Sequence, residues 1–283
     1  MAPRKNSPQN TNPAVDFLLA GTGTHNLGKS DLSTTFNIGT LTTRQKIAVY
    51  FPIPVHPGFM SPALIFLPPP LRMAPVPLIE HPTRSLELYF EQEALVASLA
   101  SAGGRQLITD FFSNTAPKRE FLYREGSTVS NLVRDNADFQ SNAKTFETEF
   151  IRRMRLVRTA NGGTIPRGTL QNELAKQGAR MTPPALPFFG IGSKLGILGS
   201  FQESRVRLTR LETPTAKSFS ATLRYEVFDH FGCDDSDLEG LPTHGTPGQI
   251  AMWLLSRDPR HGPGHKPFVV AIHVSRIVSE TQA

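Results

Sequence analysis

A cluster of acidic side chains in the last quarter of the chain, with histidines around it, is the group best suited to do chemistry. Its carboxylates are those of Asp229, Asp234, Asp235, Asp237 and Glu239. His230 lies among them, and five of the eight histidines come after residue 229. Crowded carboxylates raise one another's pKa values, and a nearby imidazole exchanges protons near neutral pH. We therefore expect Asp229 and His230 to form a catalytic acid–base pair, and we expect Asp234, Asp235 and Asp237 to hold a metal or orient water.

The same carboxylates suit a divalent cation, because hard oxygen ligands are those that Mg²⁺ and Ca²⁺ prefer. The expected metal ligands are Asp234, Asp235 and Asp237. An EF-hand is not expected, since the twelfth position of a loop that opens at Asp235 is Thr246 instead of Glu. The residues expected to bind substrate are Trp253, Arg257, His261 and Lys266. In the structural alternative, Asp234 caps a helix, Asp237 occupies its third position, and the cluster does no chemistry.

A second candidate for chemistry is a phosphate-binding loop. Residues 23–30, Gly-Thr-His-Asn-Leu-Gly-Lys-Ser, match the pattern G-x-x-x-x-G-K-[ST]. Such a loop needs a helix directly after it, whereas residues 31–39 are rich in types that avoid helix interiors. The nearest candidate for the strand that carries an Mg²⁺-binding Asp is Gln106–Asp110. Nucleotide binding is therefore only the third functional hypothesis.

Composition limits the classes of protein to which the chain can belong. The 283 residues include 22 Gly and 24 Pro, which excludes a coiled coil or helical bundle, and 19 Phe, which argues against a disordered chain. The formal charge of +6 is a mild basic bias without a convincing nucleic-acid signal. The single cysteine, Cys233, excludes an internal disulfide. Neither a signal-peptide core nor an apolar run that could span a membrane is found, so we expect a soluble protein made in a reducing cytoplasm.

The periodicity of apolar residues predicts the strands and the helix that must position the acidic cluster. Alternation over Ser218–Phe228 predicts a strand, with Arg205–Leu211 as its hairpin partner and Phe268–Val278 as a third strand. Gln249–Ser256, which carries Trp253, is expected to be a short helix. The predicted fold class is α+β, with an extended Pro-rich N-terminal region, helices in the middle and a small antiparallel sheet at the C-terminus.

Two longer helices are expected in the middle of the chain. The first begins after Pro82 and is closed by Gly103-Gly104. The second covers about Phe139–Arg158 and stops at Asn161-Gly162-Gly163. Its apolar stripe is Phe146, Phe150, Met154 and Val157. Four arginines in its last turns, which suit the helix dipole, are Arg152, Arg153, Arg155 and Arg158.

Four regions are expected along the chain. Residues 1–13 are a flexible tail, 14–82 a Pro-rich region of low charge, 83–128 a helical segment and 129–283 a C-terminal α+β domain. The Pro-rich region contains two strand-like pieces, Val15–Ala20 and Lys46–Phe51. Its prolines favour an extended arm laid over the core, with a PxxP-type docking segment or a membrane-touching segment as the alternatives.

The segment Asp229–Asp237 (DHFGCDDSD), followed by Trp253 and by Lys266-Pro267-Phe268, resembles a proteobacterial family of uncharacterised domains. That family carries D-H-F-G-x-D-x-x-D, with an aliphatic residue where Cys233 stands, then a helix with Trp and a K-P-F strand start. Leu186-Pro187-Phe188 and Leu195-Gly196-Ile197 also resemble its stretches, and the likeness covers roughly residues 130–280. Members are often encoded near type VI secretion or polymorphic-toxin genes, so the resemblance implies an interbacterial effector, to which an immunity protein would bind. It also implies a protein made in the cytoplasm of a bacterium and secreted or delivered to a target cell without a signal peptide.

A weaker likeness is to colicin M-type toxins, which hydrolyse the lipid-linked peptidoglycan precursor and place spaced Asp residues after a β-hairpin. Where those toxins have His-Arg soon after the cluster, this chain has Arg260-His261, reversed and further away. The leading hypothesis is an antibacterial effector that hydrolyses an envelope or phosphate-containing substrate. The alternative is a non-enzymatic module of a secretion system that binds a protein or a membrane.

Overall fold

The computed structural model describes residues 15–21, 78–116, 119–179, 181–184, 201, 203–215, 218–233, 247–261 and 264–281. In chain order its elements are β1 (Phe17–Gly21), η3 (Leu78–Glu80), α4 (Thr83–Ala97), α5 (Ala102–Ser113), β2 (Glu120–Tyr123), α6 (Thr128–Arg134), α7 (Ala137–Ala160), η4 (Arg167–Thr169), α8 (Leu170–Lys176), β3 (Glu203–Thr215), β4 (Ser218–Phe231), α10 (Pro247–Arg257), η5 (Pro259–His261) and β5 (Phe268–Thr281). These elements confirm the α+β class. No helix in these ranges is both long and apolar enough to cross a membrane.

The strands form one sheet of five in the order β1-β3-β4-β5-β2. The three long strands that the sequence predicted form its centre, with antiparallel β3–β4 and β4–β5 pairs. The sheet is mixed and not wholly antiparallel, because β2 pairs parallel with β5 over Glu120–Tyr123. β1 pairs with β3 at the opposite edge and confirms the strand predicted at Val15–Ala20.

The long hairpin forms because β4 carries apolar side chains at every second position. The side chains buried on one face are those of Phe219, Ala221, Leu223, Tyr225 and Val227. Successive strand residues point to opposite faces, so this alternation fixes which face of β4 turns toward the core. From Tyr225 to Asp229 every residue is buried, which shows that both faces of the sheet are covered at this end.

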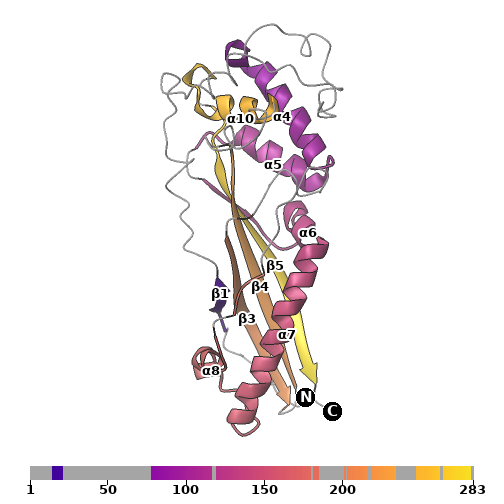
Figure 1. Cartoon of the computed structure of the whole chain (residues 1–283), viewed down its shortest axis with the longest axis vertical. Helices are drawn as coiled ribbons and strands as arrows, with labels where there is room; N and C mark the ends of the chain where they lie inside the picture. Colours follow the sequence, from indigo (N-terminus) through magenta and orange to yellow (C-terminus); the bar gives the residue numbers. More distant parts are fainter. Residues whose placement is uncertain are drawn as a thin grey trace, which may run out of the picture.

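Helix α7 covers the apolar face along the length of the hairpin (Figure 1). Asn136 caps its start by accepting a hydrogen bond from the Phe139 amide at 2.9 Å. Gly162 and Gly163 follow its end with positive φ angles, as the predicted stop requires. The predicted stripe of Phe146, Phe150, Met154 and Val157 is buried. Two of its aromatic rings pack against β4, Phe146 on Tyr225 and Phe150 on Phe219.

Helices α4, α5 and α10 gather at one end of the sheet and form what we call the helical head (Figure 1). The first predicted helix is in fact two helices. The chain turns at Leu99 and Ala100, both with φ of 50°, and α5 begins at Ala102. Gly103 and Gly104 lie inside α5 instead of ending α4. They are glycines because of close packing: a Cβ on Gly104 would lie 2.3 Å from Ser98 Oγ.

The fold also bears on the predicted nucleotide-site strand and on the predicted division of the chain into regions. Gln106–Asp110, the nearest candidate for a second nucleotide-site strand, is part of helix α5. The single sheet takes β1 from the predicted 14–82 region, β2 from the 83–128 segment and β3–β5 from the C-terminal region, so these parts share one core. The phosphate-loop match, the proposed strand at Lys46–Phe51 and the prolines of residues 51–77 lie outside the described residues.

Candidate functional site

The two sequence segments that carry the family resemblance lie side by side at the head end of the sheet. In the β4–β5 register, Asp229 pairs with Val270 and Phe231 pairs with Phe268. The two phenyl rings are 5.1 Å apart between centroids. A Cβ built on Gly232 would lie 2.7 Å from the Cβ of Pro267, so only glycine allows this approach. The D-H-F-G and K-P-F stretches of this chain therefore meet where two strand ends pack together.

Asp229 and His230 are consecutive residues of β4, and their side chains leave opposite faces of the sheet. Asp229 is on the face of Val227 and Phe231 and is only 4% exposed. The alternation of the strand thus does not support the predicted direct acid–base pair between them. Asp234, Asp235 and Asp237 lie outside the described residues, as does the cation site predicted on them. Among the residues that are described, no group of three or more His, Cys, Asp or Glu side chains could hold a metal ion.

The four residues predicted to bind substrate lie on α10 and on the segment that leads from it into β5. Trp253 is 0% exposed and packs in the core, so its indole is not available to a substrate. Arg257 is the last residue of α10. Lys266 donates from Nζ to the Ser256 carbonyl at the end of α10, 3.1 Å away, and burial lowers its pKa. Of the four, His261 has the geometry that bears most directly on catalysis.

His261 lies between a hydroxyl group and a carboxylate. Its Nδ1 is 3.0 Å from Oγ1 of Thr83, the first residue of α4. On the other side of the ring, its Nε2 is 3.8 Å from Oδ2 of Asp258. A hydroxyl, an imidazole and a carboxylate in this order are the parts of a nucleophilic acyl- or phosphoryl-transfer site.

Local structure fixes Asp258 and, through it, His261. The Asp258 amide closes α10 by donating to the Leu254 carbonyl at 2.9 Å. Its carboxylate accepts from the Arg260 amide at 3.0 Å and from the Arg260 guanidinium at 2.6 Å. The His261 amide then donates to the Asp258 carbonyl at 3.0 Å. The short helix η5 thereby places His261 close to Asp258, although Nε2 of His261 makes no hydrogen bond to the carboxylate.

Burial governs the charge of this site. The side chains of His261 and Asp258 are 4% and 0% exposed. Burial lowers the pKa of His261 below its ordinary value of 6.5; Asp258 opposes this shift and Arg260 adds to it. The imidazole is therefore neutral at pH 7, in the form that accepts a proton.

A second histidine, His265, contacts α4 one turn further along the helix than Thr83. His265 Nε2 is 3.0 Å from Oε1 of Glu87, and its ring packs against Phe111 and Phe112 of α5. Burial opposes ionisation of Glu87, but hydrogen bonds from Arg84 and His265 outweigh it and hold its pKa below the ordinary value. The contacts of Thr83 with His261 and of Glu87 with His265 thus hold α4 against the segment that follows α10. Phe111 of α5 packs both on His265 of that segment and on Phe231 of β4.

Thr83 and Asp258 were not among the residues predicted from the sequence. Asp258 precedes His261 by three residues just after a predicted helix, which is a weak local signal. Thr83 is 178 residues from His261, and nothing in the sequence pattern links the two.

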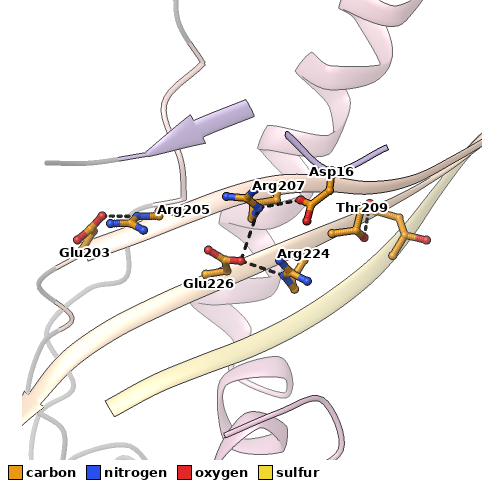
Figure 2. A network of polar contacts seen from close by, with 8 residues as sticks. Asp16, Glu203, Arg205, Arg207, Thr209, Arg224 and Glu226 are labelled. Atoms are coloured by element: carbon orange, nitrogen blue, oxygen red, sulfur yellow. Dashed lines mark hydrogen bonds and ion pairs between the residues drawn. The ribbon is translucent and has the colours of Figure 1, made fainter. Parts of the chain in front are cut away.

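The arginines of the sheet and of α7 form ion pairs with carboxylates. Figure 2 shows Arg207 between Asp16, at 2.8 Å, and Glu226, at 3.9 Å. On the same face, Arg224 also pairs with Glu226 at 2.9 Å. The four arginines at the end of α7 pair with Glu149 or Glu280. These pairings favour a structural role for both groups.

No family model, curated protein or solved structure matches the chain. The thiol of Cys233 is buried, at 4% exposure, which is unfavourable for a nucleophile.

Proposed function

We propose that this chain is an interbacterial antibacterial effector whose helical head hydrolyses a phosphate-containing substrate of the cell envelope. The single observation that supports hydrolysis best is the 3.0 Å contact between Thr83 Oγ1 and His261 Nδ1, with the carboxylate of Asp258 on the far side of the ring. The effector role rests on the sequence resemblance. The substrate we favour is a lipid-linked peptidoglycan precursor.

In the proposed reaction His261 removes the proton from the Thr83 hydroxyl while Oγ1 attacks the phosphorus. A bond forms between Oγ1 and phosphorus, and the ester or anhydride oxygen leaves with the proton that His261 returns to it. Water then attacks the phosphorylated threonine, with His261 again as the base, and restores the hydroxyl. Asp258 stabilises the imidazolium that exists between these steps.

Two arginines next to these residues in sequence suit an anionic substrate. The side chain of Arg84, beside Thr83, is 70% exposed, and that of Arg260, beside His261, is 49% exposed. Each already pairs with one carboxylate, Arg84 with Glu87 and Arg260 with Asp258. Guanidinium groups have several donors, so both can also bind phosphate oxygens.

The alternative is a module that binds a protein or a membrane and has no catalytic activity. Its specific support is the deep burial of His261, because the same contacts would then serve only to hold α4 against α10. Under either function, we propose that the Pro-rich sequence of residues 51–82 docks on a secretion component. For an effector we also propose an immunity partner, and the divalent cation on Asp234, Asp235 and Asp237 stays a prediction that Mg²⁺ or Ca²⁺ calorimetry can test.

The test is hydrolysis by the purified full chain of the lipid-linked precursor and of a phosphodiester dye. Because general-base catalysis is worth about 10²–10⁴-fold, His261→Asn is expected to lower kcat/KM by at least 10². His265→Asn removes the neighbouring histidine contact and serves as the matched control, with activity within about threefold of wild type. If the folded His261→Asn variant retains full activity, or if the wild type hydrolyses neither substrate and does not arrest bacterial growth, the hydrolase proposal fails.

A further inference from the structure

The side chains of Asp258, Arg260 and His261, which lie at η5, differ sharply in their access to solvent. Those of Asp258 and His261 are 0% and 4% exposed. That of Arg260 is 49% exposed. Of these three groups, Arg260 is therefore the one that an anion in solution can reach directly.

Arg260 holds the buried carboxylate of Asp258. Oδ1 of Asp258 accepts from the Arg260 amide at 3.0 Å, and Oδ2 accepts from Nε at 2.9 Å and from Nη2 at 2.6 Å. Hydrogen bonds between a guanidinium and a carboxylate are strong because both groups are charged. Oδ2 also faces Nε2 of His261, but the 3.8 Å between these two atoms is too long for a hydrogen bond. Arg260 and His261 thus lie beside the same oxygen atom, and only Arg260 binds it.

The imidazole of His261 lacks a contact that would fix its tautomer. Within the described part of the chain, its buried Nε2 has no hydrogen-bond partner, while its Nδ1 contacts the Thr83 hydroxyl. Nδ1 can accept the hydroxyl proton only in the tautomer that carries the ring proton on Nε2. A carboxylate that accepts a hydrogen bond from Nε2 selects this tautomer, as the carboxylate of a catalytic triad does for its own imidazole.

We propose that Arg260 is a positioning residue, which releases Asp258 to His261 when it binds a phosphate group of the substrate. The inference rests on the proposed function, because it concerns activation of the same Thr83–His261 site. Phosphate oxygens bind the Nε and Nη2 atoms of Arg260 in place of Oδ2 of Asp258. Oδ2 then moves about 1 Å closer to Nε2 of His261 and accepts a hydrogen bond of ordinary length. Oδ1 keeps its contact with the Arg260 amide, so the carboxylate stays in the site.

Binding of the substrate and activation of the base thereby become one event. The hydrogen bonds of a catalytic site commonly tighten only when substrate is bound. Here the hydrogen bond that tightens is the one that directs Nδ1 of His261 toward the Thr83 proton. The coupling also favours one class of substrate, the phosphate esters and anhydrides with a negative charge beside the bond that breaks. Neutral esters do not compete for Arg260, so they should react more slowly.

The test is proton–nitrogen NMR of the full chain with isotope-labelled histidine at neutral pH, with inorganic phosphate as the probe. Added phosphate should shift the Nε2 proton of His261 strongly downfield, the signature of a hydrogen bond to a carboxylate, and His261→Asn assigns the signal by its loss. Arg260→Gln should show the downfield proton without phosphate, because Asp258 is then available to His261 from the start. Arg210→Gln breaks another pair between an arginine and a carboxylate two residues away, Glu212, and should behave as wild type.

Circular dichroism and thermal melting establish that the variants are folded, and the phosphate titration of the wild type tests the proposal without any variant. A wild-type chain that shows the downfield proton before phosphate is added, or that shows none at any phosphate concentration, overturns the proposal. So does a folded Arg260→Gln chain without this signal. The signal requires no turnover, so a chain that gives the expected response but hydrolyses neither test substrate refutes the proposed hydrolysis and leaves the coupling intact.

Discussion

Gly232 and Pro267 are in direct contact across the head end of the β4–β5 hairpin, at a separation that leaves no room for a side chain on Gly232. A Cβ on Gly232 would lie 2.7 Å from Pro267 Cβ and 3.0 Å from its Cγ. Both residues are next to paired strand residues, Phe231 and Phe268, so neither backbone can move away freely. The contact thus couples the end of β4 to the start of β5.

Gly232→Ala is expected to destabilise the chain by about 1–3 kcal/mol, the usual cost of overpacking a well-filled site. Gly168→Ala is the matched control, because nothing lies within 4 Å of a Cβ at that position. Urea unfolding of both variants measures the difference. Equal midpoints for the two variants would show that the Gly232–Pro267 contact is not tight in solution.

Glu280→Ala should cost about 3 kcal/mol, because it leaves a charged arginine buried without its carboxylate. Glu280 and Arg158 are both 5% exposed, with Glu280 Oε2 3.6 Å from Arg158 Nη2, and Arg155 also binds Glu280. Glu212→Ala breaks an exposed pair with Arg210 and should cost less than about 1 kcal/mol. Thermal unfolding of both variants provides the comparison, and similar losses would contradict the burial argument.

Stability is expected to decrease as the pH falls below about 6.5, the ordinary histidine pKa. Burial lowers the pKa values of His261 and His273 in the folded chain, so the unfolded chain binds more protons in this range. Their contribution to stability is complete above pH 6.5 and is lost as the pH falls toward the folded values. Urea midpoints between pH 7.5 and 5 should fall less steeply in His261→Asn, and least in the double variant with His273→Asn. Parallel curves for all three proteins would contradict these directions.

Long elements with strong periodicity could be predicted from the sequence. β4 alternates over many residues, and α7 carries an apolar stripe, a cap and a glycine stop. β2 has four residues and pairs with a strand far away in the chain, so no local pattern reveals it. The pair Gly103-Gly104 was misread because glycine occurs both at helix ends and at sites of close packing. Only the tertiary neighbours, Leu132 for Gly103 and Ser98 for Gly104, distinguish the two cases.

The candidate site was predicted only in part, because contacts between residues far apart in the chain leave no local sequence pattern. His261 was predicted to bind substrate and not to act as a base, and its partner Thr83 comes from a helix 178 residues away. The Asp229–His230 pair was expected because the sequence places an imidazole within a cluster of carboxylates. The strand of Ser218–Phe228 continues to Phe231, and this extension places the two side chains on opposite faces.

The central claim is that Thr83 is a nucleophile activated by His261, and covalent labelling tests it most directly. A fluorophosphonate transfers its phosphonyl group to an activated hydroxyl, with loss of fluoride and the hydroxyl proton. Mass spectrometry of the intact chain and its peptides should show one adduct, on Thr83. We expect labelling to persist in Thr83→Ser and His265→Asn and to disappear in Thr83→Val and His261→Asn. An unlabelled wild-type chain, or an adduct that forms equally in folded His261→Asn, would contradict the proposed site.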